Sequence, residues 1–152
     1  MYVIKAEVPD AAVPTFRFER AKTMYGGKRV AVGDTVFVFA SENEGGRGLV
    51  ASGVATVAEA LPRLPGVARQ TPRVRLVVRR TASATRALGR AELKAFANAA
   101  GRPEAELHFK LYRQATDKLV GVTPATAAFL AQCCGAGPAV RASAPRLRGR
   151  RA

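Results

Sequence analysis

The first stretch of the chain, residues 2–8, alternates between two kinds of position. The even positions hold Tyr2, Ile4, Ala6 and Val8, and the odd positions hold Val3, Lys5 and Glu7. A period of two is typical of a β-strand, because successive side chains of a strand point to opposite faces. Pro9 and Asp10 then interrupt the pattern. The pattern therefore predicts an opening strand with Ile4 and Lys5 on opposite faces.

Three more stretches favour strands. Residues 35–40 follow a Gly-Asp turn signal and are apolar on both faces, as in a barrel or a covered sheet. Residues 48–57 form a predicted hairpin with them, and Gly48 and Gly53 indicate bulges or close backbone approach. Residues 73–79 alternate between valine or leucine and mostly arginine. The proline-rich stretch between the second and third of these is predicted to be a loop.

Helical signals follow in the second half of the chain. Residues 90–100 carry apolar side chains at helical spacing, and 103–108 fit a short helical turn. Thr123 and Pro124 are a cap and a first-turn proline, which predicts a helix over 124–133.

Two stretches lack a clean period. We expect 13–28 to be irregular, because aromatic and basic residues are mixed there without order. We expect 109–122 to hold one or two strands that bend near Asp117.

The order of these elements predicts an α+β fold. Strands and helices do not alternate regularly, so a parallel doubly wound sheet does not fit. A small, mostly antiparallel β pseudo-barrel flanked by helices fits better. Residues 1–135 form one predicted domain, and 136–152 a basic tail rich in arginine, proline and alanine, which we expect to be flexible.

Charge adds the strongest hint about partners. The chain has 25 lysines and arginines against 11 acids, a net charge of +14. Five arginines lie in the tail, so the domain itself stays strongly cationic. Such a field attracts nucleic acids. Compositional bias towards arginine and alanine, or a protein-interaction module with incidental charge, are alternative explanations.

Cysteine content and hydropathy suggest a location. Cys133 and Cys134 are the only cysteines, and neighbours rarely pair, so a disulfide framework is not expected. No apolar run approaches the roughly 20 residues that span a bilayer. We therefore expect a cytoplasmic protein without a membrane partner. Its oligomeric state stays open.

Four segments together resemble the EVE domain, a member of the PUA-like group that also includes YTH and ASCH domains. These segments are 2–8, the Val-Gly-Asp turn into an apolar strand at 32–39, the glycine-punctuated strand at 48–55, and Leu111-Tyr112-Arg113-Gln114 followed by Val122-Thr123-Pro124. The resemblance covers about residues 1–134. It implies a PUA-like barrel that binds RNA or DNA and accommodates one base, modified or unmodified, in a pocket.

A base pocket needs an aromatic surface for stacking and polar groups that read the edge of the base. The candidates for the pocket are Lys5, Phe16, Phe18, Tyr25, Phe39, Ser41, Tyr112 and Gln114. The candidates for contacts to flanking phosphates are Arg17, Arg20, Lys22, Lys28, Arg47 and Arg113. Core packing is the alternative for Phe39, and a solvated lysine head for Lys5.

The signals for catalysis are weaker. His108 is the only histidine, and no cysteine or histidine pairs stand at zinc spacing, so we expect no metal, no cofactor and no enzymatic activity. The catalytic alternative comes from the ASCH relatives, in which a lysine, a threonine and a glutamate can act on a modified base. Lys5 with Glu7, or Lys22 with Thr23, could serve in such a hydrolase.

Overall fold

The computed structural model describes residues 1–136. Of the tail expected to be flexible, Ala136 is the last residue of β7, and residues 137–152 lie outside the described residues. The strands are β1 Tyr2–Ala6, β2 Thr15–Met24, β3 Thr35–Ala40, β4 Gly48–Ala60, β5 Arg73–Ala84, β6 Lys118–Gly121 and β7 Cys134–Ala136. The helices are α1 Arg90–Lys94, α2 Pro103–Leu107 and α3 Pro124–Gln132, with 3₁₀ turns η1 Gly27–Arg29 and η2 Glu42–Glu44 and the π-helix η3 His108–Tyr112.

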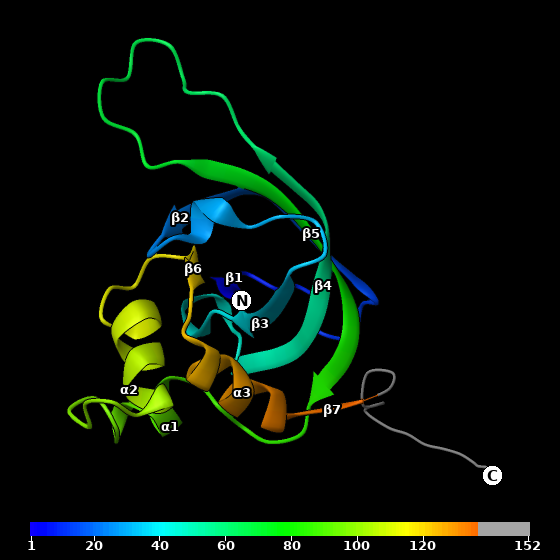
Figure 1. Cartoon of the computed structure of the whole chain (residues 1–152), viewed down its shortest axis with the longest axis vertical. Helices are drawn as coiled ribbons and strands as arrows, with labels where there is room; N and C mark the ends of the chain where they lie inside the picture. The colour runs from blue at the N-terminus through cyan, green and yellow to red at the C-terminus, as the bar shows by residue number, and fades with distance from the viewer. Residues whose placement is uncertain (137–152) are drawn as a thin grey trace, which may run out of the picture.

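Six of the strands close into a barrel, in the order β2-β6-β1-β3-β4-β5, and pairing of β2 with β5 completes the ring (Figure 1). Only β1–β3 and β2–β6 are parallel among the described pairs, and the other pairs are antiparallel. This confirms the prediction of a mostly antiparallel pseudo-barrel with short helices. The strand β7 extends the sheet beside the end of β5.

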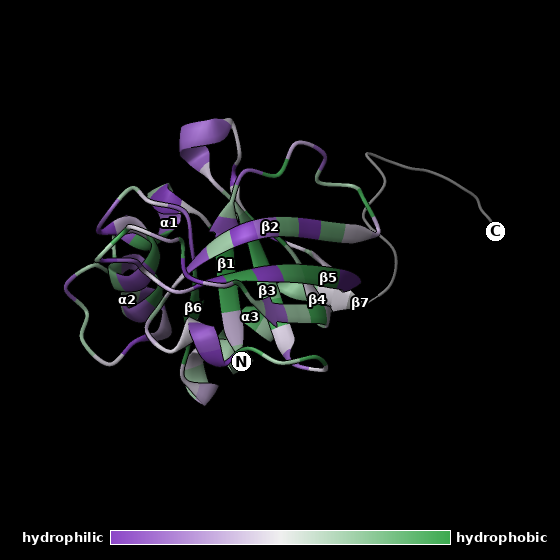
Figure 2. Ribbon diagram, turned by 90° about the horizontal axis from the view of Figure 1, so that it is seen from above, coloured by the Kyte–Doolittle hydropathy of each residue, from purple (hydrophilic) through white to green (hydrophobic). Residues whose placement is uncertain are grey.

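Apolar side chains form two separate layers. One fills the barrel and includes Ile4, Val38 and Leu76. The other lies between the outside of the barrel and the helices and includes Phe39 and Leu130. Polar and apolar segments alternate along several strands (Figure 2). The alternation predicted for 2–8 and 73–79 therefore places one face of each strand inside the barrel.

The prediction of an irregular segment at 13–28 is wrong, because most of it is β2. Phe16 and Phe18 point into the barrel with 4% and 9% of their surface exposed, while Arg17 between them is exposed. A bulge between Phe18 and Ala21 then shifts the register against β5. The extra residue resets the period of two, which hid the strand in the sequence.

The prediction of strands throughout 109–122 is only half right. β6 covers 118–121, but residues 108–112 form the π-helix η3, closed by the bond from the Arg113 N–H to the His108 carbonyl at 3.1 Å. Leu107 and Leu111 are both fully buried four residues apart, which is helical spacing. Residues 111–114 therefore belong to no strand, although the expectation for 109–122 included them.

The helix at 124–133 is confirmed with its cap. The backbone N–H of Thr126 donates to Oγ1 of Thr123 at 3.3 Å. The predicted helix at 90–100 is shorter, because α1 ends at Lys94 and turns follow. The described helices include none that is long and apolar enough to cross a membrane.

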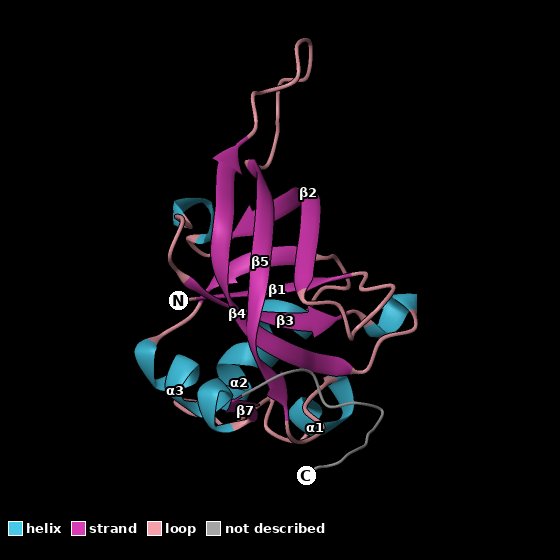
Figure 3. Cartoon of the chain, turned by 90° about the vertical axis from the view of Figure 1, so that its right-hand side faces the viewer, coloured by secondary structure: helices cyan, strands magenta, loops and turns pink. Residues whose placement is uncertain are grey.

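The hairpin of β3 and β4 is confirmed, and Gly53 explains how β4 fits against β5. A Cβ atom at Gly53 would lie 2.3 Å from the Arg79 carbonyl oxygen, so only glycine permits this approach. The hairpin of β4 and β5 is longer, and its loop 61–72 stands away from the barrel (Figures 1 and 3). The predicted loop there is confirmed.

Candidate nucleic-acid-binding site

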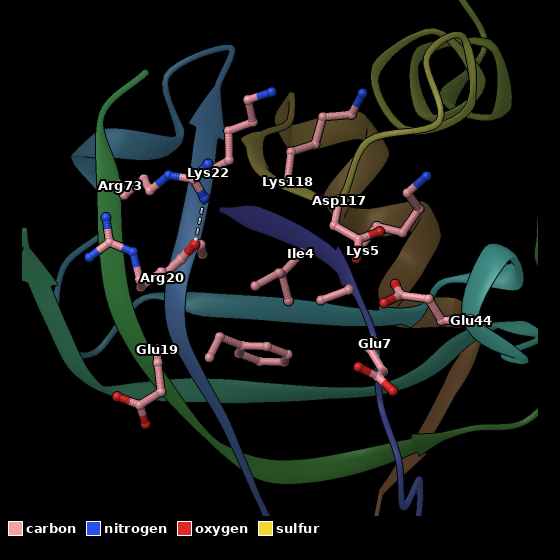
Figure 4. Close-up of a pocket in the computed structure, with 13 residues that line it drawn as sticks. Ile4, Lys5, Glu7, Glu19, Arg20, Lys22, Glu44, Arg73, Asp117 and Lys118 are labelled. Atoms are coloured by element: carbon pink, nitrogen blue, oxygen red, sulfur yellow. Dashed lines mark hydrogen bonds between the residues drawn. The ribbon is translucent and has the colours of Figure 1, made fainter. Parts of the chain in front are cut away.

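The barrel wall is incomplete beside β6. This strand pairs with β1 only as far as Lys118 opposite Lys5, and with β2 only at Thr23 and Met24. Past Lys118, no strand of the described chain lies between β1 and β2. A cavity of about 360 Å³ occupies this gap (Figure 4).

Basic and acidic side chains are concentrated on opposite sides of the cavity. Figure 4 shows Arg20, Lys22 and Arg73, called the cationic wall here, on the side of β2 and β5, where Glu19 also lies. Glu7 and Glu44 lie on the opposite side. The full lining is Ile4, Lys5, Ala6, Glu7, Phe18, Glu19, Arg20, Ala21, Lys22, Glu44, Arg73, Asp117 and Lys118. Such a site offers both hydrogen-bond donors and acceptors to a ligand.

The cationic wall is braced by the backbone. The guanidinium of Arg73 donates to the carbonyl oxygen of Arg20 at 2.9 Å, the bond that Figure 4 draws as a dashed line. Because Arg20 lies within the bulge in β2, the bulge and the first residue of β5 set the position of this wall together. Bulges commonly re-aim side chains at functional sites.

One carboxyl group on the acidic side of the cavity, that of Glu44, has a strongly raised pKa. A hydrogen bond with Asp117 is the main reason that the pKa of Glu44 rises to about 7, and burial and the negative charges of Asp117 and Glu7 raise it further. Two carboxyl groups that share a hydrogen bond retain a proton more readily than either alone. The charge of this side therefore changes with pH around 7.

Two buried lysines lie beside the cavity, directly opposite each other on β1 and β6. Lys5 is 0% exposed and Lys118 is 2% exposed. Burial lowers the pKa of both ammonium groups, and the charge of Lys5 further lowers that of Lys118. Lys118 donates to the Gln114 carbonyl at 3.5 Å, whereas Nζ of Lys5 has no hydrogen-bond partner in the described chain.

Tyr112 closes the space above Lys5. The ammonium of Lys5 lies 5.0 Å from the centre of the Tyr112 ring, and the hydroxyl of Tyr112 donates to Glu42 at 3.0 Å. Burial, followed by the charge and hydrogen bond of Glu42, raises the pKa of this hydroxyl. Ser41, which precedes η2, is also buried with no partner for its hydroxyl in the described chain.

The structure separates the residues predicted for the base pocket. Lys5 and Phe18 line the cavity. Phe16 and Phe39 do not line it, and pack instead in the two apolar layers. The sequence had led us to expect a pocket lined by aromatic rings, but Phe18 is the only aromatic residue among the described residues that line this cavity.

The remaining pocket candidates lie around the cavity or away from it. Tyr112 and Ser41 lie near Lys5 without lining the cavity, and Gln114 is exposed in the turn before β6. Tyr25 lies near the opposite end of β6, where its carbonyl accepts from the Gly121 N–H at 3.1 Å.

The predicted phosphate contacts divide in the same way. Arg20 and Lys22 line the cavity. Arg17 and Lys28 are exposed elsewhere, and Arg47 lines a different hollow of about 490 Å³. Arg113 stacks its guanidinium over Phe109 at 4.8 Å. Only part of the predicted cationic set therefore gathers at one place.

Sequence reasoning missed Arg73, Lys118, Glu44 and Asp117. Arg73 and Lys118 are the first residues of β5 and β6. The sequence could therefore indicate that each begins a strand, but not that the two lie at one cavity. Their meeting depends on β2 and β6 lying side by side, which no local pattern encodes.

Several solved structures share the fold of this chain. The DUF55 domain of human thymocyte nuclear protein 1 matches with a TM-score of 0.60 and 15% identity, over 86% of this chain and 96% of that one. A protein from Pseudomonas putida matches with a TM-score of 0.56 and 17% identity, over 87% and 97%. Human THYN1 protein in complex with 5-methylcytosine-containing DNA matches with a TM-score of 0.57 and 16% identity, over 86% and 95%.

Comparison of sequences adds nothing to these likenesses, since no family model and no curated protein matches the chain. At the level of class, the six-stranded barrel with its short helices is a PUA-like α+β pseudo-barrel. Within that class, the chain has the fold of the DUF55, or EVE, domain. The fold implied by the sequence resemblance is thus confirmed.

Proposed function

We propose that the chain is a nucleic-acid-binding domain that holds a single base, modified or unmodified, in the cavity beside β6. The observation that carries this proposal is the cavity itself, with a cationic wall on one side and carboxyl groups on the other. Its volume, about 360 Å³, lies within the usual range of ligand pockets.

Each part of the cavity matches a part of a nucleotide. Carboxylates accept hydrogen bonds from the exocyclic amino group of a base, and lysine donates to ring nitrogen or carbonyl oxygen. Ile4 and Phe18 supply apolar surface to the flat face of the ring. Arg20 and Lys22 would contact the flanking phosphates.

One comparison suggests which nucleic acid and which base to test first. The related human THYN1 protein was solved with 5-methylcytosine-containing DNA. That finding supports DNA as the first polymer to test and 5-methylcytosine as the first base, with cytosine and RNA of the same sequence as competitors. The net charge of +14 supports a polyanion of either kind.

A matched pair of charge variants tests the cationic wall. The double variant Arg20→Ala, Lys22→Ala removes two charges from the cavity, and Arg17→Ala, Lys28→Ala removes two exposed charges that lie outside it. In fluorescence anisotropy with a labelled oligonucleotide, the first variant should lose about 0.7 in salt slope per contact on single strands or about 0.9 on duplexes. Equal losses in both variants would reduce binding to bulk charge.

The seat of the base needs a separate test. Ala21 lines the cavity and is half-buried. Ala21→Leu should narrow the cavity, so the preference for an oligonucleotide with the base over one with an abasic position should fall, while the phosphate contacts hold the overall affinity. Unchanged discrimination would place the base elsewhere.

We propose binding without turnover. The rival function, hydrolysis of a modified nucleoside, would require Lys5 as a reacting amine, yet its ammonium lies beneath Tyr112 with no exposed surface. Incubation with modified nucleosides followed by mass spectrometry separates the two functions. Product release that stops on Lys5→Ala would favour the hydrolase.

A further inference from the structure

The loop 61–72 between β4 and β5 is the most projecting part of the described chain. It extends beyond the ends of both strands (Figure 3). Its outer residues are apolar: Leu64 is 50% exposed and Val67 is 46% exposed, with Pro65 and Gly66 between them. Exposing large apolar side chains to water is unfavourable in free energy, and exposed apolar patches commonly mark sites of interaction.

The loop is internally ordered despite its exposure. The amide of Gln70 accepts from the Leu64 N–H at 2.8 Å and donates to the carbonyls of Leu64 at 2.7 Å and Val67 at 2.8 Å. The guanidinium of Arg63 donates to the Ala68 carbonyl at 3.1 Å. Gly66 supplies the positive φ of 79° that the tip requires. A loop held in this way loses little conformational entropy when a partner binds.

The charges around the loop are all of one sign. The stretch 60–73 contains no aspartate or glutamate, and Arg63 and Arg69 flank the apolar tip. A hollow of about 360 Å³ at the base of the loop is lined by Arg20, Lys22 and Arg73, among others. These three residues are also the cationic wall of the base cavity. The tip and the cavity are therefore joined by one cationic surface.

We propose that the loop 61–72 is a wedge that enters the base stack of duplex DNA beside the base held in the cavity. This inference rests on the proposed function and adds the form of nucleic acid that is recognised. Apolar side chains such as leucine and proline are the residues that proteins insert between base steps, next to cations that hold the backbone. Lifting a base from a duplex costs a few kcal/mol, and the wedge would offset part of that cost by filling the opened step.

A double variant separates the wedge from general binding. Leu64→Ser, Val67→Ser keeps every charge and removes the apolar tip. The control is Val32→Ser, because Val32 is 66% exposed on a turn of the barrel away from the loop. Binding is compared on a duplex, on the same duplex with one unpaired position, and on the single strand. Stacked 2-aminopurine in the duplex reports opening through a rise in fluorescence.

We expect the wild type to raise 2-aminopurine fluorescence in the duplex. The double variant should lose that rise and about tenfold in duplex affinity, and retain its affinity for the single strand and the already opened duplex. The control should match the wild type throughout. Gln70→Ala, which keeps the apolar tip but frees the loop, should give a smaller loss on the duplex alone.

Three results would overturn the wedge. Equal losses on duplex and single strand would make the loop an ordinary contact. Unchanged binding in the double variant would remove it from the interface. Binding to phosphatidylserine vesicles that depends on Leu64 and Val67, without duplex opening, would assign the tip to a membrane surface. Failure of the proposed function differs from these, because then the wild type binds none of the three nucleic acids.

Discussion

The two apolar layers of this protein differ in the buried polar side chains that lie next to them. The barrel interior is made of apolar side chains such as Val38, Leu76 and Leu119. The layer under the helices is equally apolar, but the elements that border it, β1, β6 and α3, also carry the buried polar side chains of Lys5, Lys118 and Thr126. The candidate cavity lies where these two regions meet, because Ile4 and Phe18 of the barrel interior and the buried Lys5 and Lys118 all line it.

This difference shows where a small barrel can accommodate the charged and polar groups of a binding site. Inside a closed ring of strands, a charge would lack partners, and burying it would cost several kcal/mol. At the open seam beside β6, polar groups can be shielded from water and still lie close to a ligand. The buried lysines and the carboxyl pair therefore collect at the seam.

The largest expected effect tests whether Phe39 belongs to the core alone. Phe39→Ala should lower the free energy of unfolding by about 3–5 kcal/mol, because it removes a fully buried ring and leaves a cavity. Urea denaturation measures this loss. The same variant should keep its base preference wherever it stays folded. A lost preference at unchanged stability would return Phe39 to the binding site.

The next largest effect on stability concerns Glu106, a half-buried carboxylate with several hydrogen-bond donors. Glu106 accepts from Lys110 at 2.8 Å and from the side chain and backbone N–H of Thr123. Burial alone would raise the pKa of Glu106, but hydrogen bonds from Lys110, Thr126 and Thr123 together lower it. Its stabilisation is therefore present above the unfolded pKa and is lost as pH falls through the folded pKa.

Glu106→Gln should lower stability by about 1–3 kcal/mol at neutral pH. Urea denaturation at several pH values measures the change. The gap between wild type and variant should close in acid below about pH 4, the ordinary range of a glutamate. A gap that persists in acid would show that charge is not what stabilises this contact.

Lys5 provides the opposite case, because its buried ammonium has no hydrogen-bond partner in the part of the chain that the structure describes. Its pKa is lowered chiefly by burial, so folding disfavours the charged form. Stability of the wild type should rise with pH between the lowered folded pKa and the ordinary lysine value. Lys5→Met keeps the length of the side chain and should stabilise the protein by about 1 kcal/mol at neutral pH, with a flatter pH profile. Destabilisation would show that the ammonium has a favourable role in the fold.

The smallest effect concerns the rim of the cavity. Because the pKa of Glu44 is raised to about 7, lowering the pH through this value protonates the group and removes a negative charge near the phosphates. Nucleic-acid affinity should rise about twofold to fivefold from about pH 8 to about pH 6, as expected for one charge near a polyanion. Glu44→Gln should bind like the low-pH form throughout, as measured by anisotropy. A variant that retains the pH step would assign it to another group.

Local pattern predicted much of the fold. The alternation of 2–8 and 73–79, the apolar run 35–40 and the Thr123 cap correspond to β1, β5, β3 and α3. β2 was missed because a bulge interrupts its period. Residues 109–112 were assigned to a strand although the stretch 109–122 shows no clean period, and the structure places them in the π-helix η3. The spacing of Leu107 and Leu111, four residues apart and both buried, is helical.

The residues predicted for the site do not all gather at the candidate cavity. Lys5, Phe18, Arg20 and Lys22 do line the cavity, while Phe16 and Phe39 fill the interior. Aromatic residues on strands suit a stacking surface and a core equally well in sequence, because both uses need the same side chain. Only burial separates them.

The sequence by itself determined the alternation of the strands, the cap of the last helix and the excess of positive charge, because each of these depends on neighbouring residues or on simple composition. The tertiary structure alone decided that β6 is too short to fill the wall between β1 and β2, and so that a hollow opens there. β1 and β6 are more than a hundred residues apart in the chain. Their pairing is fixed by the closure of the whole barrel, and no short stretch of sequence carries that information.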